Sequence, residues 1–163
     1  MKPLAKDRIP YGSWVSIGVR EATLEDAPAL RSFLTTQGLP TEDILAPGTV
    51  YWLAETASKE LIASAGLEFG NEAGLLRSVA TAEIQRRKGL GKIMVDTALE
   101  KARAHGLRHV YLFSTGAGNY FVGLGFVESP VEELVAAVPN APQVIRFAAL
   151  GWLSTEVAWR IDL

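Results

Sequence analysis

The stretch VATAEIQRRKGLGKIM, residues 79–94, joins an apolar run to an amphipathic helix through a basic turn that carries glycines. The run that leads into it, LLRSVAT at residues 75–81, is apolar and β-branched enough to predict a strand. Beyond the turn, apolar side chains recur at helical spacing from Leu90 to Ala102, which predicts a helix that begins near Gly89. A helix start presents unpaired backbone N–H groups and the positive end of the helix dipole, so this turn suits an anion.

The turn has features that would admit a bulky anion such as a pyrophosphate. Glycine has no side chain, so Gly89 and Gly91 let such a group approach the backbone closely. Four basic side chains add positive charge around them: Arg86, Arg87, Lys88 and Lys92. A solvated basic turn before a surface helix would show the same pattern, and the turn alone does not separate the two interpretations.

Two other phosphate-binding signatures do not fit this turn. A Walker A loop requires Ser or Thr after its Gly-Lys pair, whereas Lys92 is followed by Ile93. A dinucleotide fingerprint requires a further glycine at the position that Met94 occupies. The chain therefore carries neither signature.

Residues 86–91, RRKGLG, do resemble the acetyl-CoA signature of the GNAT acyltransferases, Arg/Gln-x-x-Gly-x-Gly/Ala. The preceding strand keeps that family's spacing, because Thr81 lies eight residues before Gly89. A second signature, the family's Leu-Gly-Phe, is matched at residues 124–126. The order of expected elements resembles the GNAT fold over about residues 15–163.

A narrower resemblance is to the ArsN-type acetyltransferases of arsenic-resistance operons. It rests on residues 39–43, 65–68, 75–80 and 121–126. This resemblance implies acceptors that are amino-acid analogues with an arsenic or phosphorus oxyacid, and resistance by acetylation as the biology.

Length and composition predict one ordinary globular domain. The chain has 163 residues, of which 48% are hydrophobic and 21% charged. We expect an irregular N-terminal arm at residues 1–13 and a single acetyltransferase domain over residues 14–163. The net charge of -2 gives no electrostatic reason to expect a nucleic-acid partner.

Cysteine is absent, which excludes disulfides, thiolate metal sites and a cysteine nucleophile. The two histidines, His105 and His109, lack the spacing of a zinc site, so we expect no metal. No apolar run has the length of a signal-peptide core or approaches the roughly 20 residues that span a bilayer. We therefore expect a cytoplasmic protein without a membrane partner.

The pattern of apolar runs predicts a mixed α/β (α+β) fold with a mostly antiparallel sheet of six or seven strands flanked by helices. A short helix at residues 40–45 and another at 119–124 are also expected. Because a helix at about 90–105 separates the fourth and fifth strands, we expect those two to pair in parallel. The expected strands are 14–20, 50–55, 61–69, 75–81, 109–114 and 156–161, the expected longer helices begin at 24, 90 and 131, and a loop is expected at 139–142.

By the GNAT resemblance, the cofactor is acetyl-CoA. Backbone groups of Val79 and Thr81 would hold the pantetheine arm and the thioester carbonyl, and amides of residues 87–92 would hold the pyrophosphate. The cofactor-binding residues implied are Val79, Ala80, Thr81, Arg86, Arg87, Lys88, Gly89, Leu90, Gly91 and Lys92.

An amine with a pKa near 10 must lose a proton before it attacks a thioester, which requires a base or a desolvating site. The candidate base is Glu68, at the end of a strand that should neighbour residues 75–81. Alternatively, Glu68 pairs with Arg77 across the sheet or lies in solvent. Arg77 itself is a candidate to bind an acidic group of the substrate, or else it reaches a surface carboxylate.

The chain lacks the tyrosine that many GNAT members use to protonate the departing thiolate. Many members place a Tyr four residues before the Gly of Leu-Gly-Phe, and this chain has Phe121 there. Tyr120 is the candidate acid, although it points about 100° away on an ideal helix. Ser114 could bind substrate or relay a proton, or simply cap its strand. A thiol pKa near 8.5 would also let CoA leave without a dedicated acid.

The sequence thus predicts an N-acetyltransferase that moves acetyl from acetyl-CoA to the primary amine of a small acidic acceptor, by direct attack at the thioester. Three alternatives stay open: a non-catalytic acyl-CoA binding or sensing module, an interaction domain that kept only the fold, and a protein N-terminal or lysine acetyltransferase. A homodimer is also left open.

Overall fold

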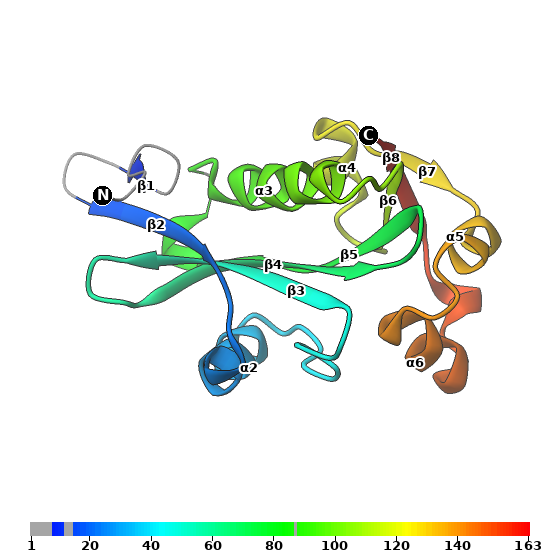
Figure 1. The fold of residues 1–163 in the computed structure, drawn as a ribbon, viewed down its shortest axis with the longest axis horizontal. Coiled ribbons are helices and arrows are strands. Elements are labelled where there is room, and N and C mark those ends of the chain that lie inside the picture. The colour runs from blue at the N-terminus through cyan, green and yellow to red at the C-terminus, as the bar shows by residue number, and fades with distance from the viewer. Residues whose placement is uncertain (1–7, 12–14, 87) are drawn as a thin grey trace.

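The computed structural model describes residues 8–11, 15–86 and 88–163, and it contains the predicted sheet. Over these residues the sheet has eight strands in the order β1-β2-β3-β4-β5-β6-β8-β7 (Figure 1). The strands are β1 (Arg8–Tyr11), β2 (Val15–Glu21), β3 (Thr49–Thr56), β4 (Leu61–Phe69), β5 (Ala73–Thr81), β6 (His109–Phe113), β7 (Val127–Ser129) and β8 (Ala158–Asp162).

The strand pairing confirms the predicted topology. Strands β1 to β5 form successive antiparallel pairs. β5 and β6 then pair in parallel, with Ala73 opposite His109 and Leu75 opposite Tyr111. These are the fourth and fifth strands of the sequence prediction. β8 pairs antiparallel with both β6 and β7, so the end of the chain lies between them.

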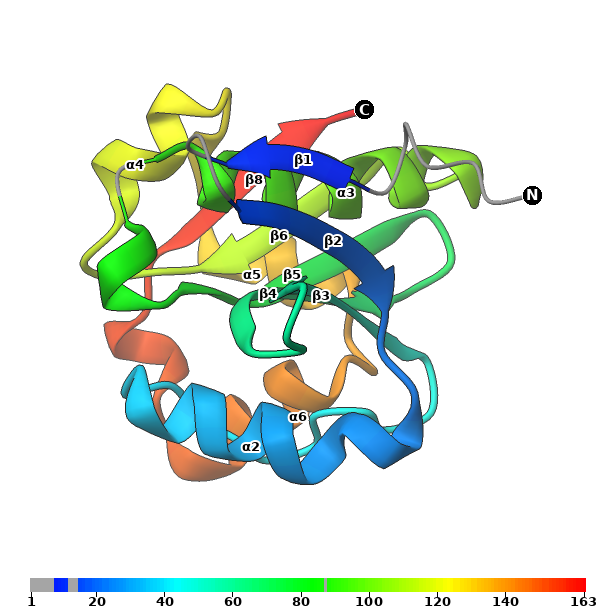
Figure 2. The same ribbon diagram turned by 90° about the vertical axis from the view of Figure 1, so that its left-hand side faces the viewer.

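Helices cover both faces of this sheet. α3 lies on one face and α2 on the other, and α6 lies on the same side as α2 (Figures 1 and 2). No helix in the described part of the chain is both long and apolar enough to cross a bilayer. The helices are η1 (Leu24–Asp26), α2 (Ala27–Thr36), η2 (Glu83–Gln85), α3 (Leu90–Ala104), α4 (Gly118–Gly123), α5 (Val131–Ala137), α6 (Pro142–Leu150) and η3 (Leu153–Thr155).

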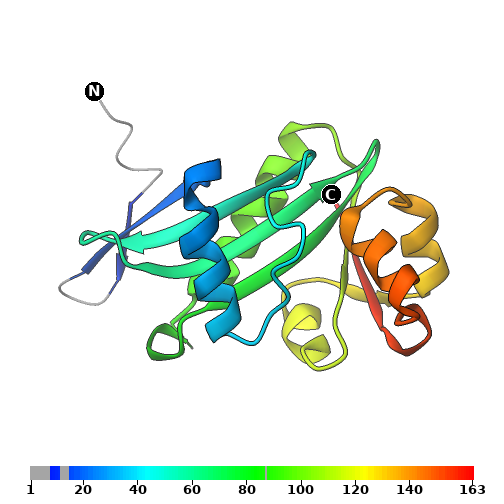
Figure 3. The ribbon, with the colours of Figure 1, turned by 90° about the horizontal axis from the view of Figure 1, so that it is seen from below.

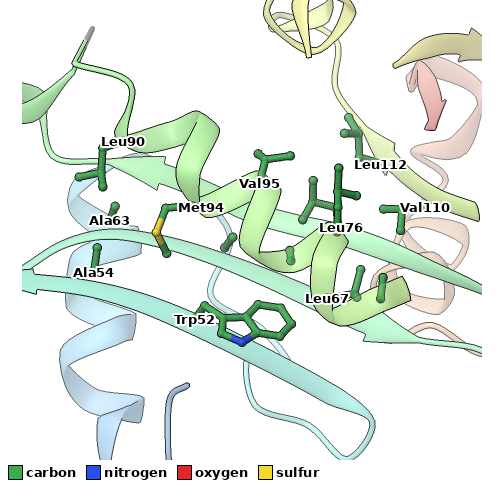
Figure 4. Close-up of a cluster of buried hydrophobic side chains, with 14 of the residues drawn as sticks. Trp52, Ala54, Ala63, Leu67, Leu76, Leu90, Met94, Val95, Val110 and Leu112 are labelled. Atoms are coloured by element: carbon green, nitrogen blue, oxygen red, sulfur yellow. The ribbon is translucent and has the colours of Figure 1, made fainter. Parts of the chain in front are cut away.

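The core between α3 and the sheet fixes where α3 begins. Met94 and Val95 are fully buried, and Trp52 from β3 packs in the same cluster (Figure 4). The buried face of α3 comprises Leu90, Met94, Val95, Ala98, Leu99 and Ala102, which follows the helical spacing read from the sequence. Burial of Leu90 at the first turn anchors the glycine turn beside the end of β5.

Several expectations about local structure were wrong. Arg8–Tyr11 forms a strand where we expected an irregular arm. Residues 42–45 form turns and not a helix, because Asp43 and Leu45 have left-handed φ angles of 59° and 101°. Helix α6 was not predicted at all. Trp14 in the first expected strand lies outside the described residues.

Candidate functional site

The glycine turn and the end of β5 enclose a cavity of about 480 Å³, called here the cofactor cavity. Gly89 caps α3 with a φ of 83°, a left-handed conformation that favours glycine. The cavity is lined by Val79, Ala80, Thr81, Gln85, Arg86, Gly89, Gly91, Lys92 and Tyr120. Most of the residues predicted to hold the cofactor therefore lie together.

Two of the predicted residues, Leu90 and Lys88, are not among those that line the cavity. Leu90 is only 1% exposed, so its side chain belongs to the core and only its backbone can face a ligand. Lys88 is exposed and is not among the residues that line the cavity. Arg87 lies outside the described residues. Lys92 lines the cavity but also pairs with Asp96, with Nζ and Oδ2 2.6 Å apart.

Arg86 lies against the cavity wall. Its Nε donates to the Thr81 carbonyl over 3.1 Å, and its Nη2 donates to Gln37 Oε1 over 2.7 Å. The guanidinium thus contacts one of the backbone groups expected to hold the pantetheine arm. Gln85 lines the same cavity, and sequence reasoning missed it although it directly precedes the motif.

Tyr120 on α4 faces the cofactor cavity despite its shifted sequence position. A Cβ built at Gly91 would lie 2.5 Å from the Tyr120 hydroxyl, so α4 packs closely on the start of α3. The side chain is partly covered, and this burial raises the pKa of the Tyr120 hydroxyl. Phe121 is 7% exposed and packs edge-on against Phe126 instead.

A second cavity of about 170 Å³, called here the acceptor pocket, meets the first at Val79. It lies where β5 and β6 separate, because their parallel pairing ends at Leu75 and Tyr111. The predicted substrate residues Arg77 and Ser114 both contribute to its wall. The full lining is Leu39, Leu76, Arg77, Ser78, Val79, Leu112, Phe113, Ser114, Ala117 and Phe121.

β5 has a bulge beside these cavities. The register between β4 and β5 shifts between Ser64 and Gly66, and Ser78 has a φ of 55°. Such a conformation costs roughly 1–3 kcal/mol in a residue other than glycine. It is held by Ser64 Oγ, which donates to the Ser78 carbonyl over 2.7 Å, and by the Tyr51 hydroxyl, 2.7 Å from Ser78 Oγ.

Glu68 is sealed within the protein at 1% exposure and does not line either cavity. Its Oε2 accepts a hydrogen bond of 2.9 Å from Arg77 Nη1, and its Oε1 accepts one of 3.1 Å from the backbone N–H of Gln143. Burial raises the pKa of the Glu68 carboxyl, while Arg77 acts in the opposite direction. The cross-sheet pair that the sequence left as an alternative is thus present, and the assignment of Glu68 as base stays a prediction.

Ser114 ends β6 as a hydrogen-bonded cap. Its Oγ accepts from the backbone N–H of Ala117 over 3.0 Å, and its carbonyl accepts from Trp159 Nε1 over 2.9 Å. Ser114 also lines the acceptor pocket, so the cap lies in the pocket wall. Within the described ranges, no group of three or more His, Cys, Asp or Glu residues could hold a metal ion.

A sheet opened beside a glycine-capped helix, with two cavities that share Val79 in their walls, can bring a large anionic donor and a small acceptor together. The family model described as the acetyltransferase (GNAT) family matches residues 19–126, and the chain belongs to this family. As a member, it is an acetyl-CoA-dependent acetyltransferase.

Solved structures show the same fold. N-acetylglutamate synthase from Neisseria gonorrhoeae, complexed with coenzyme A and N-acetyl-glutamate, matches with a TM-score of 0.72 at 19% identity; the match covers 90% of this chain and 35% of that one. A GNAT acetyltransferase from Staphylococcus aureus Mu50 matches with a TM-score of 0.71 at 18% identity, over 90% of this chain and 99% of that one. Rv2747 from Mycobacterium tuberculosis, solved in complex with CoA, matches with a TM-score of 0.68 at 20% identity, over 89% and 98% of the two chains. The chain thus spans about a third of the length of the Neisseria enzyme.

Proposed function

We propose that this protein transfers acetyl from acetyl-CoA to the primary amine of a small, acidic, amino-acid-like acceptor. The observation that carries the proposal is the meeting of the cofactor cavity and the acceptor pocket at Val79, with Arg77 in the wall of the smaller one. Direct attack at the thioester needs this juxtaposition, because the amine and the acyl carbon must come within bonding reach.

In this proposal the backbone holds the donor. N–H groups at the start of α3, with the helix dipole behind them, bind the pyrophosphate beside Gly89 and Gly91. Backbone groups of Val79 and Thr81 hold the pantetheine arm and stabilise the oxyanion that forms on the thioester carbonyl. The left-handed backbone conformation of Ser78 supports the proposed role of the Val79 backbone, because it alters the direction of the chain just before Val79.

Arg77 recognises the acidic group of the acceptor. A guanidinium has five N–H donors, and three of the bonds that Arg77 makes go to Glu68 Oε2, Glu42 O and Ser78 Oγ. The Neisseria enzyme, with which this fold is shared, binds N-acetyl-glutamate, which is an acetylated acidic amino acid. The ArsN-type resemblance extends the acceptor class to amino-acid analogues that carry an arsenic or phosphorus oxyacid.

The proton steps involve two predicted residues. As the amine nitrogen bonds to the acyl carbon and the C–S bond breaks, one proton leaves the amine and one reaches the thiolate. We propose that Tyr120 supplies the second proton, which is supported by its position among the residues that line the cofactor cavity. Glu68 is the base that the sequence predicts for the first proton, but its burial away from both cavities favours release of that proton to water, and the Glu68→Gln variant described below distinguishes the two.

Calorimetric titration with acetyl-CoA, CoA and ATP tests the donor site. We expect saturable binding of acetyl-CoA and CoA and none of ATP. Turnover is then followed by thiol release, which has no protein background because the chain lacks cysteine. We expect acidic amino acids to be acetylated faster than their neutral amides. Absence of acetyl-CoA binding would overturn the proposal.

Arg77→Gln tests the acceptor assignment. Loss of a charged hydrogen bond should raise the KM for an acidic acceptor about 10- to 100-fold. The KM for the matching neutral amide should change much less, and acetyl-CoA affinity should stay the same. Equal effects on both acceptors would contradict a charge-reading role for Arg77.

A further inference from the structure

Glu68 joins two parts of the molecule that are far apart in sequence. Helix α6 begins after Ala141, which has no side chain able to cap a helix, and Pro142 has no N–H to donate. The first free donor of the helix, the N–H of Gln143, is instead satisfied by Glu68 Oε1 at 3.1 Å. The carboxylate therefore caps α6 from the sheet, which the positive end of the helix dipole favours.

The other oxygen of Glu68 fixes Arg77, and Arg77 fixes the chain between α2 and β3. This segment, residues 37–48, is called here the strap, and it crosses the face of the sheet between α2 and α6 (Figure 3). Arg77 Nη2 donates to the carbonyl of Glu42 in the strap over 3.0 Å. On the outer side, Glu42 Oε1 pairs with Arg146 Nη2 of α6 at 3.2 Å.

These contacts form a closed path, called here the ring. Glu68 contacts Arg77, Arg77 contacts Glu42, and Glu42 contacts Arg146 of α6. The N-terminus of α6 then contacts Glu68. The ring holds a segment that needs support, because its residues Asp43 and Leu45 have left-handed φ angles. It also borders the acceptor pocket, since Leu39 of the strap and Arg77 both line that cavity.

We propose that Glu68 is a positioning residue for the acetyl acceptor and not the base that deprotonates it. Its carboxylate, held between Arg77 and α6, sets the orientation of the Arg77 guanidinium and the place of the strap, so acceptor affinity depends on Glu68. The ligand in this inference is the acidic amine of the proposed function, on which the inference rests.

Three observations separate this role from that of a base. A base must reach the amine, whereas Glu68 is 1% exposed and absent from the walls of both cavities. Both of its oxygens already accept hydrogen bonds. The Arg77 side chain, which lies between Glu68 and the pocket in this network, is itself 3% exposed.

Glu68→Gln in the full chain tests the inference, with acetyl-CoA saturating and an acidic acceptor varied. We expect the acceptor KM to rise about tenfold or more, through loss of a charged hydrogen bond. We expect kcat to stay within about threefold, because the chemical step is untouched. The pH profile of kcat should keep its acidic limb, and the affinity for acetyl-CoA should not change. A fall in kcat of about a hundredfold with loss of that limb, at constant KM, would establish Glu68 as base and overturn the inference.

Arg146→Ala gives a second test that spares the buried pair. It removes only the outer contact to Glu42, from a side chain that is 35% exposed, so folding should be retained. We expect a rise in acceptor KM in the same direction, which a base at Glu68 does not predict. The control is Lys59→Ala, which removes an exposed partner of the largely buried Glu55, a residue outside the ring, and should change nothing. An Arg146→Ala enzyme with wild-type KM would contradict the ring.

Hydrogen exchange makes the test independent of turnover. In Glu68→Gln, amides of the strap and of the first turn of α6 should exchange faster than in the wild type, while those of α3 should not. Unchanged exchange in both segments would overturn the inference even for an active enzyme. If the wild type acetylates no acidic amine, the proposed function fails, and this comparison still reports on the ring.

Discussion

The Tyr120 hydroxyl occupies the space that a side chain at position 91 would need. A Cβ at Gly91 would lie 2.5 Å from that hydroxyl but 3.5 Å from the ring carbon that carries it. The first distance is a clash and the second an ordinary contact. Gly91 therefore does more than admit an anion, because it also allows Tyr120 to reach the cofactor cavity.

Gly91→Ala should consequently act through Tyr120. We expect the variant to fold, since the hydroxyl is the far end of a movable side chain, and to lose about tenfold or more in kcat through displacement of the proposed acid. In a Tyr120→Phe background the clash is absent, so Gly91→Ala should have little further effect. Thiol-release kinetics on the four proteins measures this coupling, and additive losses would contradict it.

Gly89 provides the contrast at the same turn. A Cβ there would meet nothing within 4 Å, but its φ of 83° disfavours other residues. The two glycines look alike in the sequence motif. Only the structure shows that position 89 favours glycine because of its backbone conformation, whereas position 91 favours it because a side chain would clash with Tyr120. Residue spacing could predict that both matter, whereas the contact with Tyr120 depends on how α4 packs.

At the scale of elements, sequence patterns predicted those helices and strands whose signals lie within the element itself. The apolar periodicity from Leu90 and the unbroken apolar run of β6 located α3 and the parallel pair. Helix α6 was missed because its N-cap residue, Ala141, gives no capping signal. Its cap is Glu68, 75 residues away, and such a partner cannot be read from a local window.

The junction of η1 and α2 shows the opposite case, a cap made by two residues close in sequence, Thr23 and Asp26. Asp26 Oδ2 accepts from the Thr23 backbone N–H over 2.7 Å, and Arg20 Nη2 pairs with Asp26 Oδ1 at 2.7 Å. The hydrogen bond from Arg20 holds the pKa of the Asp26 carboxyl well below its usual range. The charged carboxylate therefore stabilises the folded state.

Asp26→Ala should lower the free energy of unfolding by about 1–2 kcal/mol at pH 7, the combined range of a lost cap and a partly exposed ion pair. Because the folded pKa is depressed, this stabilisation is complete above the unfolded pKa of about 3.9 and is lost as the pH falls below it. Urea unfolding from pH 7 to pH 2 should thus show the wild type and variant converging. Glu25→Gln, at an exposed neighbouring position, is the control, and a pH-independent difference would contradict this account.

At the scale of the whole molecule, the sheet and the proposed acceptor site include parts that follow the family match. That match ends at residue 126, yet β8 pairs with β6 over five positions and α6 carries Gln143 and Arg146. A chain that ended at residue 126 would expose the β6 edge and the cluster that Tyr111 and Leu75 form with α5 and α6. The strands on both sides of residue 126 thus belong to one continuous sheet, although the motifs lie in the first four-fifths of the sequence.

Deletion of residues 127–163 should therefore abolish folding, not merely acceptor binding. We expect the shortened chain to lack a cooperative thermal transition and to precipitate, because a bare strand edge and an uncovered apolar cluster favour association. Deletion of residues 1–11 is the matched control. Among the described residues it removes β1, an outer strand paired on one side with β2, so cooperative melting and acetyl-CoA binding should persist. Far-UV circular dichroism melts and calorimetry compare the two. A shortened chain 1–126 that melted cooperatively and bound acetyl-CoA would show that the cofactor half folds alone, and that β8 and α6 serve only the acceptor.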